Sequence, residues 1–189
     1  MRLFVAVDLD ASARDAIVAE QKRLQRALGE RGESAWKWAR PDRMHLTLAF
    51  IGEVDAPAAD AIGAVLRKPF EDSAFTIVFA GLGVFPARGA PKVLWVGVSD
   101  GRAEIVALQR RVVERLASVG VAPETRAYHP HLTLARGGSA TPGDGRRTVA
   151  LGRGSPIARI EARAVSLYES RLSQAGPDYT TLVRTELRS

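Results

Sequence analysis

Alternation of apolar and polar residues along the chain predicts a series of short strands separated by helices. Strands are expected over residues 2–8, 34–38, 44–50, 74–80, 93–98, 128–136, 157–168 and 179–187. Apolar residues at helical spacing predict helices over 12–29, from about 55 to 67, and over 102–119. Segments 81–91 and 137–153 are rich in glycine and other turn formers, so loops are expected there, with no helix after residue 136. Strands without regular strand–helix alternation predict an α+β fold with antiparallel sheets.

One hexapeptide occurs twice in this pattern. His45-Leu-Thr-Leu-Ala-Phe50 and His131-Leu-Thr-Leu-Ala-Arg136 agree at five of six positions and lie 86 residues apart (131 minus 45). Two of the three histidines of the chain open these repeats. A helix, a motif strand and further strands follow one another in each half. We therefore expect one domain over residues 1–189, built from two intertwined lobes about a pseudo-twofold axis. Their sheets would line a central groove, with helices on the outer faces.

The spacing inside each repeat has a chemical meaning. Residues i and i+2 of a strand project to the same face, so His45 and Thr47 project together, as do His131 and Thr133, while the leucines between them face a core. Two imidazoles across a groove suit attack on a phosphodiester, which needs a base on the entering oxygen and an acid on the leaving oxygen. The two hydroxyls can donate to the phosphate oxygens. This chemistry requires no metal and no cofactor.

Paired motifs of this kind resemble those of the two-histidine phosphoesterase superfamily, and the chain is most similar to its RNA 2′,3′-cyclic phosphodiesterase branch, also called 2′-5′ RNA ligase-like. The likeness extends over nearly the whole sequence. It includes Arg2-Leu-Phe-Val-Ala-Val, Gly52, Gly83-Val-Phe-Pro86, Pro91-Lys-Val-Leu-Trp-Val-Gly97, Tyr128-His-Pro-His-Leu-Thr-Leu-Ala-Arg136, Leu167-Tyr-Glu-Ser-Arg-Leu172 and Gly176-Pro-Asp-Tyr179.

The resemblance implies hydrolysis of a terminal 2′,3′-cyclic phosphate to a 2′-phosphate. It implies that His45 is the proton donor to the departing 3′ oxygen and that His131 is the proton acceptor that activates water. It also implies that Thr47, Thr133 and Arg136 bind the substrate phosphate. Periodicity does not support Arg136, which is out of phase with His131 on a regular strand.

Several other residues have open interpretations. Phe50, at the position that matches Arg136, either stacks on a nucleobase or belongs to the core. His129 is in phase with His131 and is either a third site residue or a structural histidine next to Pro130. A zinc site of His45, His129 and His131 is an alternative, although no carboxylate accompanies them in phase. The tryptophans Trp36, Trp38 and Trp95 are expected in the core, and Arg40 and Arg126 are expected to be solvated charges.

Composition adds limits to this hypothesis. The net charge is +6 and the pI about 10.3, which favours a polyanionic partner such as an RNA end or a small cyclic nucleotide. The chain has no cysteine, which excludes disulfides and thiol nucleophiles and fits the cytoplasm. No apolar run approaches the roughly 20 residues of a membrane helix, so no membrane contact is expected. Because the duplication supplies both halves of the site, a monomer is expected.

Three functions compete with metal-independent hydrolysis. Reversible 2′-5′ RNA ligation uses the same groups with a 5′-hydroxyl in place of water. A non-catalytic module would bind RNA ends without turnover. A zinc hydrolase would lose its activity with a chelator.

Overall fold

The computed structural model describes residues 1–173 and 176–189, which form nine strands and five helices. The strands are β1 (Arg2–Asp8), β2 (Trp36–Trp38), β3 (His45–Glu53), β4 (Phe75–Phe85), β5 (Val93–Asp100), β6 (His131–Gly137), β7 (Ala158–Ala162), β8 (Ala164–Ser173) and β9 (Gly176–Glu186). The helices are α1 (Ala11–Leu28), α2 (Glu30–Ala35), α3 (Ala56–Arg67), α4 (Arg102–Ala117) and α5 (Pro142–Ala150), and a 3-10 turn, η1 (Pro41–Arg43), precedes β3.

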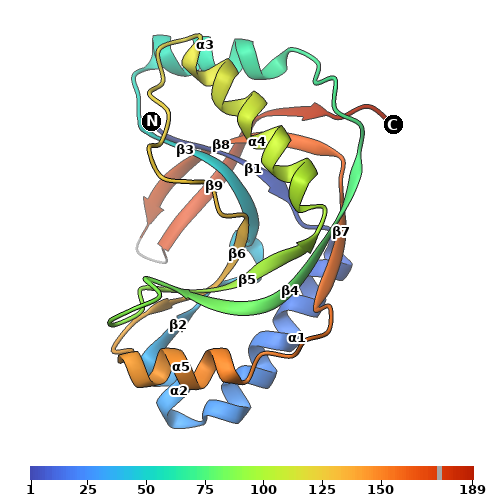
Figure 1. Cartoon of the computed structure of the whole chain (residues 1–189). Coiled ribbons are helices and arrows are strands. Elements are labelled where there is room, and N and C mark those ends of the chain that lie inside the picture. Colours follow the sequence, from blue (N-terminus) through green and yellow to red (C-terminus); the bar gives the residue numbers. More distant parts are fainter. Residues whose placement is uncertain (174–175) are drawn as a thin grey trace.

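The strands form two separate antiparallel sheets (Figure 1). The four-stranded sheet has the order β3-β1-β8-β9, and the five-stranded sheet has the order β2-β6-β5-β4-β7. Each sheet contains one motif strand, β3 in the first and β6 in the second. The predicted α+β class with two antiparallel sheets is confirmed.

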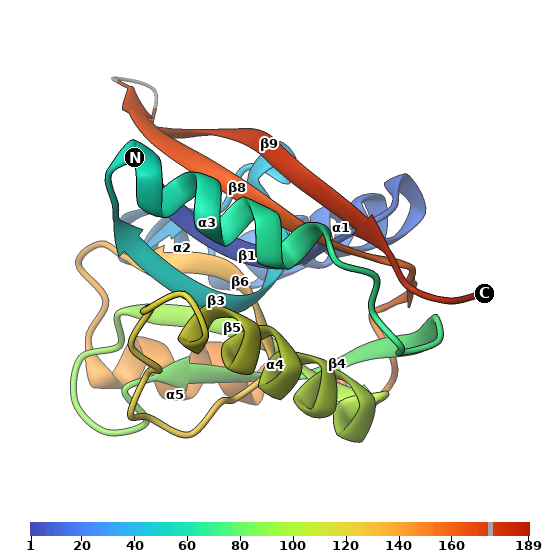
Figure 2. The same cartoon turned by 90° about the horizontal axis from the view of Figure 1, so that it is seen from above.

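The helices divide between the two sheets. Helix α3 packs against β9, and α4 packs against α3 and β3 of the four-stranded sheet. Helices α1, α2 and α5 contact β7, β2 and β4 of the five-stranded sheet and gather at the opposite end of the molecule (Figures 1 and 2). Apolar residues of both sheets and of the helices join in one buried cluster. None of the helices in the described residues has the length and apolar character that crossing a membrane requires.

Neither sheet is made from one half of the sequence. Strands β1 and β3 come from the first third of the chain, and their partners β8 and β9 come from its end. The single strand predicted over 157–168 is wrong, because the chain passes from the five-stranded sheet to the four-stranded sheet at Arg163, between β7 and β8. Alternation continues across this crossing, so the pattern did not reveal it. The expectation of one domain over 1–189 stays a prediction.

Two other boundaries differ from the predicted ones. The segment expected as a strand over 34–38 begins as helix α2, and only Trp36–Trp38 is extended. The loop expected to start at Gly81 starts later, because β4 continues to Phe85. Gly81 has φ of 72° and is the extra residue of a bulge against β5, a left-handed conformation that glycine adopts without a steric penalty.

The expectation of no helix after residue 136 is wrong. Helix α5 begins with a capping box, in which the Thr141 side chain accepts from the Asp144 backbone N–H and the Asp144 carboxylate accepts from the Thr141 backbone N–H at 2.8 Å. Pro142 occupies the first turn, where a backbone N–H would have no partner within the helix, so the missing N–H of proline costs nothing. The glycines in this segment suggested a loop, but the cap satisfies the first turn of the helix.

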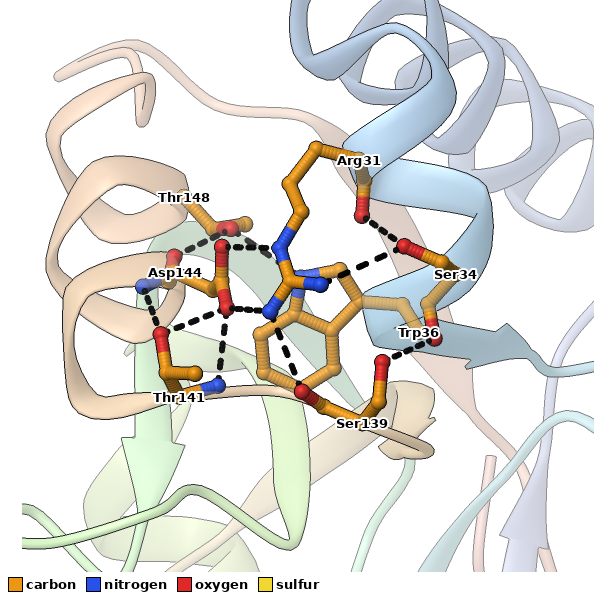
Figure 3. A network of polar contacts seen from close by, with 7 residues as sticks. All are labelled: Arg31, Ser34, Trp36, Ser139, Thr141, Asp144 and Thr148. Atoms are coloured by element: carbon orange, nitrogen blue, oxygen red, sulfur yellow. Dashed lines mark hydrogen bonds and ion pairs between the residues drawn. The ribbon is translucent and has the colours of Figure 1, made fainter.

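A polar network anchors α5 to α2 (Figure 3). The guanidinium of Arg31 donates to the Asp144 carboxylate, with Nε 2.9 Å from Oδ1. Thr148 donates to the carbonyl oxygen of Asp144 at 2.8 Å and accepts from the indole N–H of Trp36 at 3.1 Å. The Arg31 guanidinium, followed by the Thr141 hydroxyl, holds the pKa of Asp144 well below its usual range.

Candidate active site

The two motif strands lie next to each other across the interface of the sheets. Cα atoms of β3 and β6 approach within 8 Å, and the Tyr128 hydroxyl donates to the Thr47 carbonyl oxygen at 2.9 Å. The motif leucines are buried, and the histidines and threonines beside them are half-buried; the leucines are Leu46, Leu48, Leu132 and Leu134. The predicted alternation is therefore confirmed in both strands.

A cavity of about 930 Å³ opens between the motif strands, α4 and the segment before β6. Its walls include Thr47 and Phe50 from β3 and His131 from β6, together with His129. The cavity thus brings together residues from both repeats. His45, Thr133 and Arg136 are not among its wall residues, and the ring of His45 packs against Phe4.

Both motif strands contain a β-bulge at the same place. In β3, Thr47 pairs with Ala6 and Ala49 pairs with Val5, so Leu48 is the extra residue. In β6, Thr133 pairs with Trp95 and Ala135 pairs with Leu94, so Leu134 is the extra residue. Leu48 and Leu134 are equivalent in the two repeats. The duplication therefore extends from the side chains to the backbone geometry.

The bulge changes which side chains share a face. Beyond Leu134 the alternation shifts by one residue, so Ala135 is buried and Arg136 lies on the face of Thr133 and His131. The expectation that Arg136 is out of phase assumed a regular strand and is wrong. The same shift in β3 turns Phe50 outward, where 66% of its surface is exposed, so the core interpretation of Phe50 is excluded.

His45 lies among aromatic rings. The ring of Phe4 stacks on it with the centroids 4.6 Å apart, and Tyr179 meets it edge-on at 5.3 Å. Burial lowers the pKa of His45 to about 4, although a hydrogen bond to the Arg43 backbone and the charge of Asp8 act to raise it; the charge of Arg136 also lowers it. In the free protein this imidazole is therefore neutral at pH 7.

His131 lies in a second aromatic cluster. Its ring is 5.1 Å from Phe85 and 6.2 Å from Trp95, measured between centroids. Its Nδ1 lies 2.7 Å from the carbonyl oxygen of His129, to which it donates in the neutral form. Burial lowers the pKa of His131, and this hydrogen bond acts to raise it. With the proton on Nδ1, the Nε2 atom carries the lone pair that can accept a proton.

His129 is the third imidazole of this region. Its ring meets Trp95 at 4.9 Å, and burial followed by the charges of Arg102 and His131 lowers its pKa. The zinc alternative needs at least three ligands around one point. Within residues 1–173 and 176–189, no group of three or more His, Cys, Asp or Glu side chains has such an arrangement.

Trp95 lies beside the site, although the sequence predicted it in the core. Trp36 is buried as expected, but Trp95 is half-buried beside the site and pairs with Thr133 across β5 and β6. Its indole lies flat over Gly83, where an added Cβ would be 2.1 Å from the ring. The pairing of Trp95 with Thr133 depends on the register of β5 and β6, which the sequence does not reveal.

Charged residues around the site are unevenly placed. Arg136, Arg43 and Arg2 act together on the Tyr179 hydroxyl, where their charges oppose the increase in pKa that burial causes. Of the two arginines expected as solvated charges, Arg40 pairs with Asp42 on the surface, and Arg126 is exposed at the edge of the cavity. Three arginines therefore lie close enough to Tyr179, whose ring contacts His45, to act on its hydroxyl.

The fold and the paired motif strands define a two-histidine type of phosphoesterase architecture. The chain belongs to the 2′-5′ RNA ligase superfamily, whose family model matches residues 13–172. A protein of Aeropyrum pernix named RNA 2′,3′-cyclic phosphodiesterase is 36% identical over 155 residues, which cover 81% of this chain and 87% of the relative. A protein of the same name from Archaeoglobus fulgidus is 33% identical, covering 96% and 98%.

Solved structures agree with this assignment. The structure of E. coli LigT complexed with 3′-AMP superposes with a TM-score of 0.77 at 25% identity, covering 100% of this chain and 98% of LigT. The resemblance drawn from the repeated motifs is therefore confirmed at the level of the family and the fold.

Proposed function

We propose that this protein hydrolyses the terminal 2′,3′-cyclic phosphate of RNA to a 2′-phosphate without a metal ion. His45 is the proton donor and His131 is the proton acceptor. Relatives that are 33–36% identical carry the name RNA 2′,3′-cyclic phosphodiesterase, which supports the reaction class. LigT, with the same fold, has been crystallised with the nucleotide 3′-AMP.

One observation carries the mechanism: two bulged strands, one from each sheet, approach each other beside a cavity, and each presents a histidine and a threonine on one face. In-line displacement at phosphorus needs groups on opposite sides of the phosphate. A single sheet presents its side chains from one direction only. Two sheets that approach each other supply groups from two directions.

His131 accepts a proton from water at Nε2 while the water oxygen bonds to phosphorus. The bond between phosphorus and the 3′ oxygen breaks, and His45 gives its proton to that oxygen. The products are a 2′-phosphate and a free 3′-hydroxyl, and the two histidines have exchanged protonation states.

The remaining motif residues would bind the substrate. Thr47 and Thr133 would donate hydrogen bonds to the non-bridging oxygens, where charge accumulates. The Arg136 guanidinium would neutralise the phosphate, since charge-assisted hydrogen bonds are the stronger ones. Phe50, exposed at the cavity, would stack on the terminal base.

The test is an assay of EDTA-treated protein on adenosine 2′,3′-cyclic monophosphate, with identification of the product. We expect adenosine 2′-monophosphate, and we expect His45→Ala and His131→Ala each to lose about 10²–10⁴-fold in kcat. His129→Ala removes the third imidazole and should cost far less. Full activity in either of the first two variants refutes the assignment. Loss with EDTA and recovery with zinc would favour a zinc hydrolase, and tight RNA binding without turnover a non-catalytic module.

Ligation is the second candidate, because a 5′-hydroxyl can replace water as the nucleophile that attacks the cyclic phosphate. It is distinguished by incubating two RNA halves and analysing the linkage formed. A monomeric state and a cytoplasmic location stay predictions; sedimentation of the purified protein tests the first.

A further inference from the structure

The two halves of the site match in backbone and motif but differ in the residue that pairs with each histidine. In the four-stranded sheet, His45 pairs with Asp8 of β1. In the five-stranded sheet, the equivalent partner of His131 is Gly97 of β5. Cross-strand partners in an antiparallel pair project to the same face. His45 therefore has a carboxylate beside it where His131 has no side chain.

The Asp8 carboxylate is held in place by two donors from β8. The hydroxyl of Ser166 donates to Oδ2 at 2.8 Å, and the phenolic hydroxyl of Tyr168 donates to Oδ1. Ser166 is fully buried, and the ring of Tyr168 stacks on Phe4, which in turn stacks on His45. Asp8 thus belongs to a fixed layer around the His45 ring.

Among the described residues, the titratable or charged groups that face His45 come from three strands. They are Asp8 on β1, Arg136 on β6 and Tyr179 on β9, and the Arg43 backbone accepts from the ring on the fourth side. Asp8 is the acidic member of this set. It opposes the effects of burial and of Arg136, both of which disfavour the imidazolium.

We propose that Asp8 is a positioning residue that offsets part of the effect of burial on the His45 imidazole and so supports His45 as the proton donor. A fixed negative charge beside one imidazole stabilises its protonated form, and Gly97 places no such charge beside His131. This inference rests on the proposed function. It identifies a difference between the surroundings of two nearly identical motifs, which the motifs themselves do not determine.

The first test needs no substrate. The chain has three histidines, so NMR resolves three imidazoles that can be assigned by single substitutions. We expect Asp8→Asn to lower the pKa of His45 by about one unit and to leave that of His131 nearly unchanged. Asp60→Asn, the same change at an exposed carboxylate on α3, should leave both unchanged. An unchanged pKa of His45 in folded Asp8→Asn protein overturns the inference.

The second test uses the reaction. The alkaline limb of kcat reports the acid in the substrate complex, so Asp8→Asn should move it about one unit lower and reduce kcat about tenfold above the limb. An inactive wild-type protein would refute the proposed function but leave the NMR test standing. Active protein with an identical limb in wild type and Asp8→Asn would refute the role of Asp8 alone.

A second variant covers the case in which Asp8→Asn does not fold. Tyr168→Phe keeps the ring that stacks on Phe4 and the charge of Asp8, but removes a donor that disperses this charge. We expect the pKa of His45 to rise, opposite to the effect of Asp8→Asn. An unchanged or lower pKa in Tyr168→Phe contradicts the proposal.

Discussion

Tyr128 donates a hydrogen bond from its hydroxyl to the backbone carbonyl oxygen of Thr47, across 2.9 Å. Tyr128 lies three residues before the start of the second motif strand, so the contact joins the segment before that strand to the first motif strand. Burial raises the pKa of the Tyr128 hydroxyl, so it remains a donor throughout the neutral range. This hydrogen bond therefore links the four-stranded sheet to the chain segment that leads into the five-stranded sheet.

We expect Tyr128→Phe to lower the free energy of unfolding by about 1 kcal/mol and to lower kcat as well. Urea unfolding and steady-state kinetics measure the two effects. Ser99→Ala provides the control, because the Ser99 hydroxyl donates to the Val78 carbonyl oxygen within the five-stranded sheet. It should cost some stability and leave kcat unchanged. Equal kcat in Tyr128→Phe and wild type would show that the contact does not align the site.

The pKa values of both histidines predict an acidic optimum for kcat/KM. Burial lowers both, that of His45 to about 4, and in the proposed mechanism the reactive form has His45 protonated and His131 neutral. The product of these two fractions is largest between the two pKa values, so the optimum of kcat/KM should lie below pH 6.5. The bound phosphate anion favours the imidazolium, so the alkaline limb of kcat should lie at higher pH. An optimum above pH 7 in kcat/KM would contradict this assignment.

Arg136 is expected to act on phosphate because the bulge at Leu134 brings it into phase. Arg136→Gln should lower kcat/KM about 10- to 100-fold, the value of a hydrogen bond to a charged group, and should weaken the salt dependence of KM. Arg159→Gln, at an exposed position of β7, makes the same change in net charge away from the motif strands. Similar losses in the two variants would point to overall charge rather than to a specific contact.

Substitution of Phe50 tests whether a base binds at the exposed side of β3. Phe50→Ala should leave thermal stability nearly unchanged, because the side chain is 66% exposed. If the ring stacks on the base, KM should rise about tenfold, since stacking contributes about 1–3 kcal/mol per base. Leu172→Ala removes another exposed apolar side chain, 77% exposed and outside the cavity wall. The two variants should differ in KM and agree in stability.

Helix α5 begins with a cap that should contribute to the stability of the fold. Thr141→Ala removes this N-cap and should lower the free energy of unfolding, measured with urea, by about 1 kcal/mol.

The Asp144 carboxylate of the same cap should make the stability depend on pH. The folded-state pKa of Asp144 is lowered, so its contribution is fully present above the unfolded value of about 3.9 and is lost as the pH falls further. The stability difference between wild type and Asp144→Asn should therefore be constant from pH 7 to 5 and shrink below pH 4. A constant difference down to pH 3 would contradict this linkage.

Much of the site was readable from the sequence, for a physical reason. The near-identical repeats identified the catalytic candidates, and two-residue periodicity placed His45 with Thr47 and His131 with Thr133. The bulges at Leu48 and Leu134 were not readable, because an extra residue in a strand leaves no sign in an apolar run. The phase of Arg136 was therefore predicted wrongly, and the environment of Phe50 was left open.

Contacts between residues far apart in the sequence were also not predictable. The pairing of Asp8 with His45 depends on the register of β1 and β3, and the contact of Arg31 with Asp144 joins residues 113 positions apart. The start of α5 did carry a local signal, Thr141-Pro-Gly-Asp144, which fits a capping box. The loop prediction followed the glycines of this segment rather than the capping-box signal.

The crossing at Arg163 has a consequence for how the protein is made. Strand β1 lies between β3 and β8 in the four-stranded sheet. Strands β8 and β9 follow β1 to β7 in the sequence, so the ribosome synthesises them after the other strands. Until then β1 has one unpaired edge, and the layer of Asp8, Ser166 and Tyr168 around His45 does not exist. A nascent chain in which both repeats are already translated therefore still lacks the two side chains that hold the Asp8 carboxylate, and these arrive only with β8.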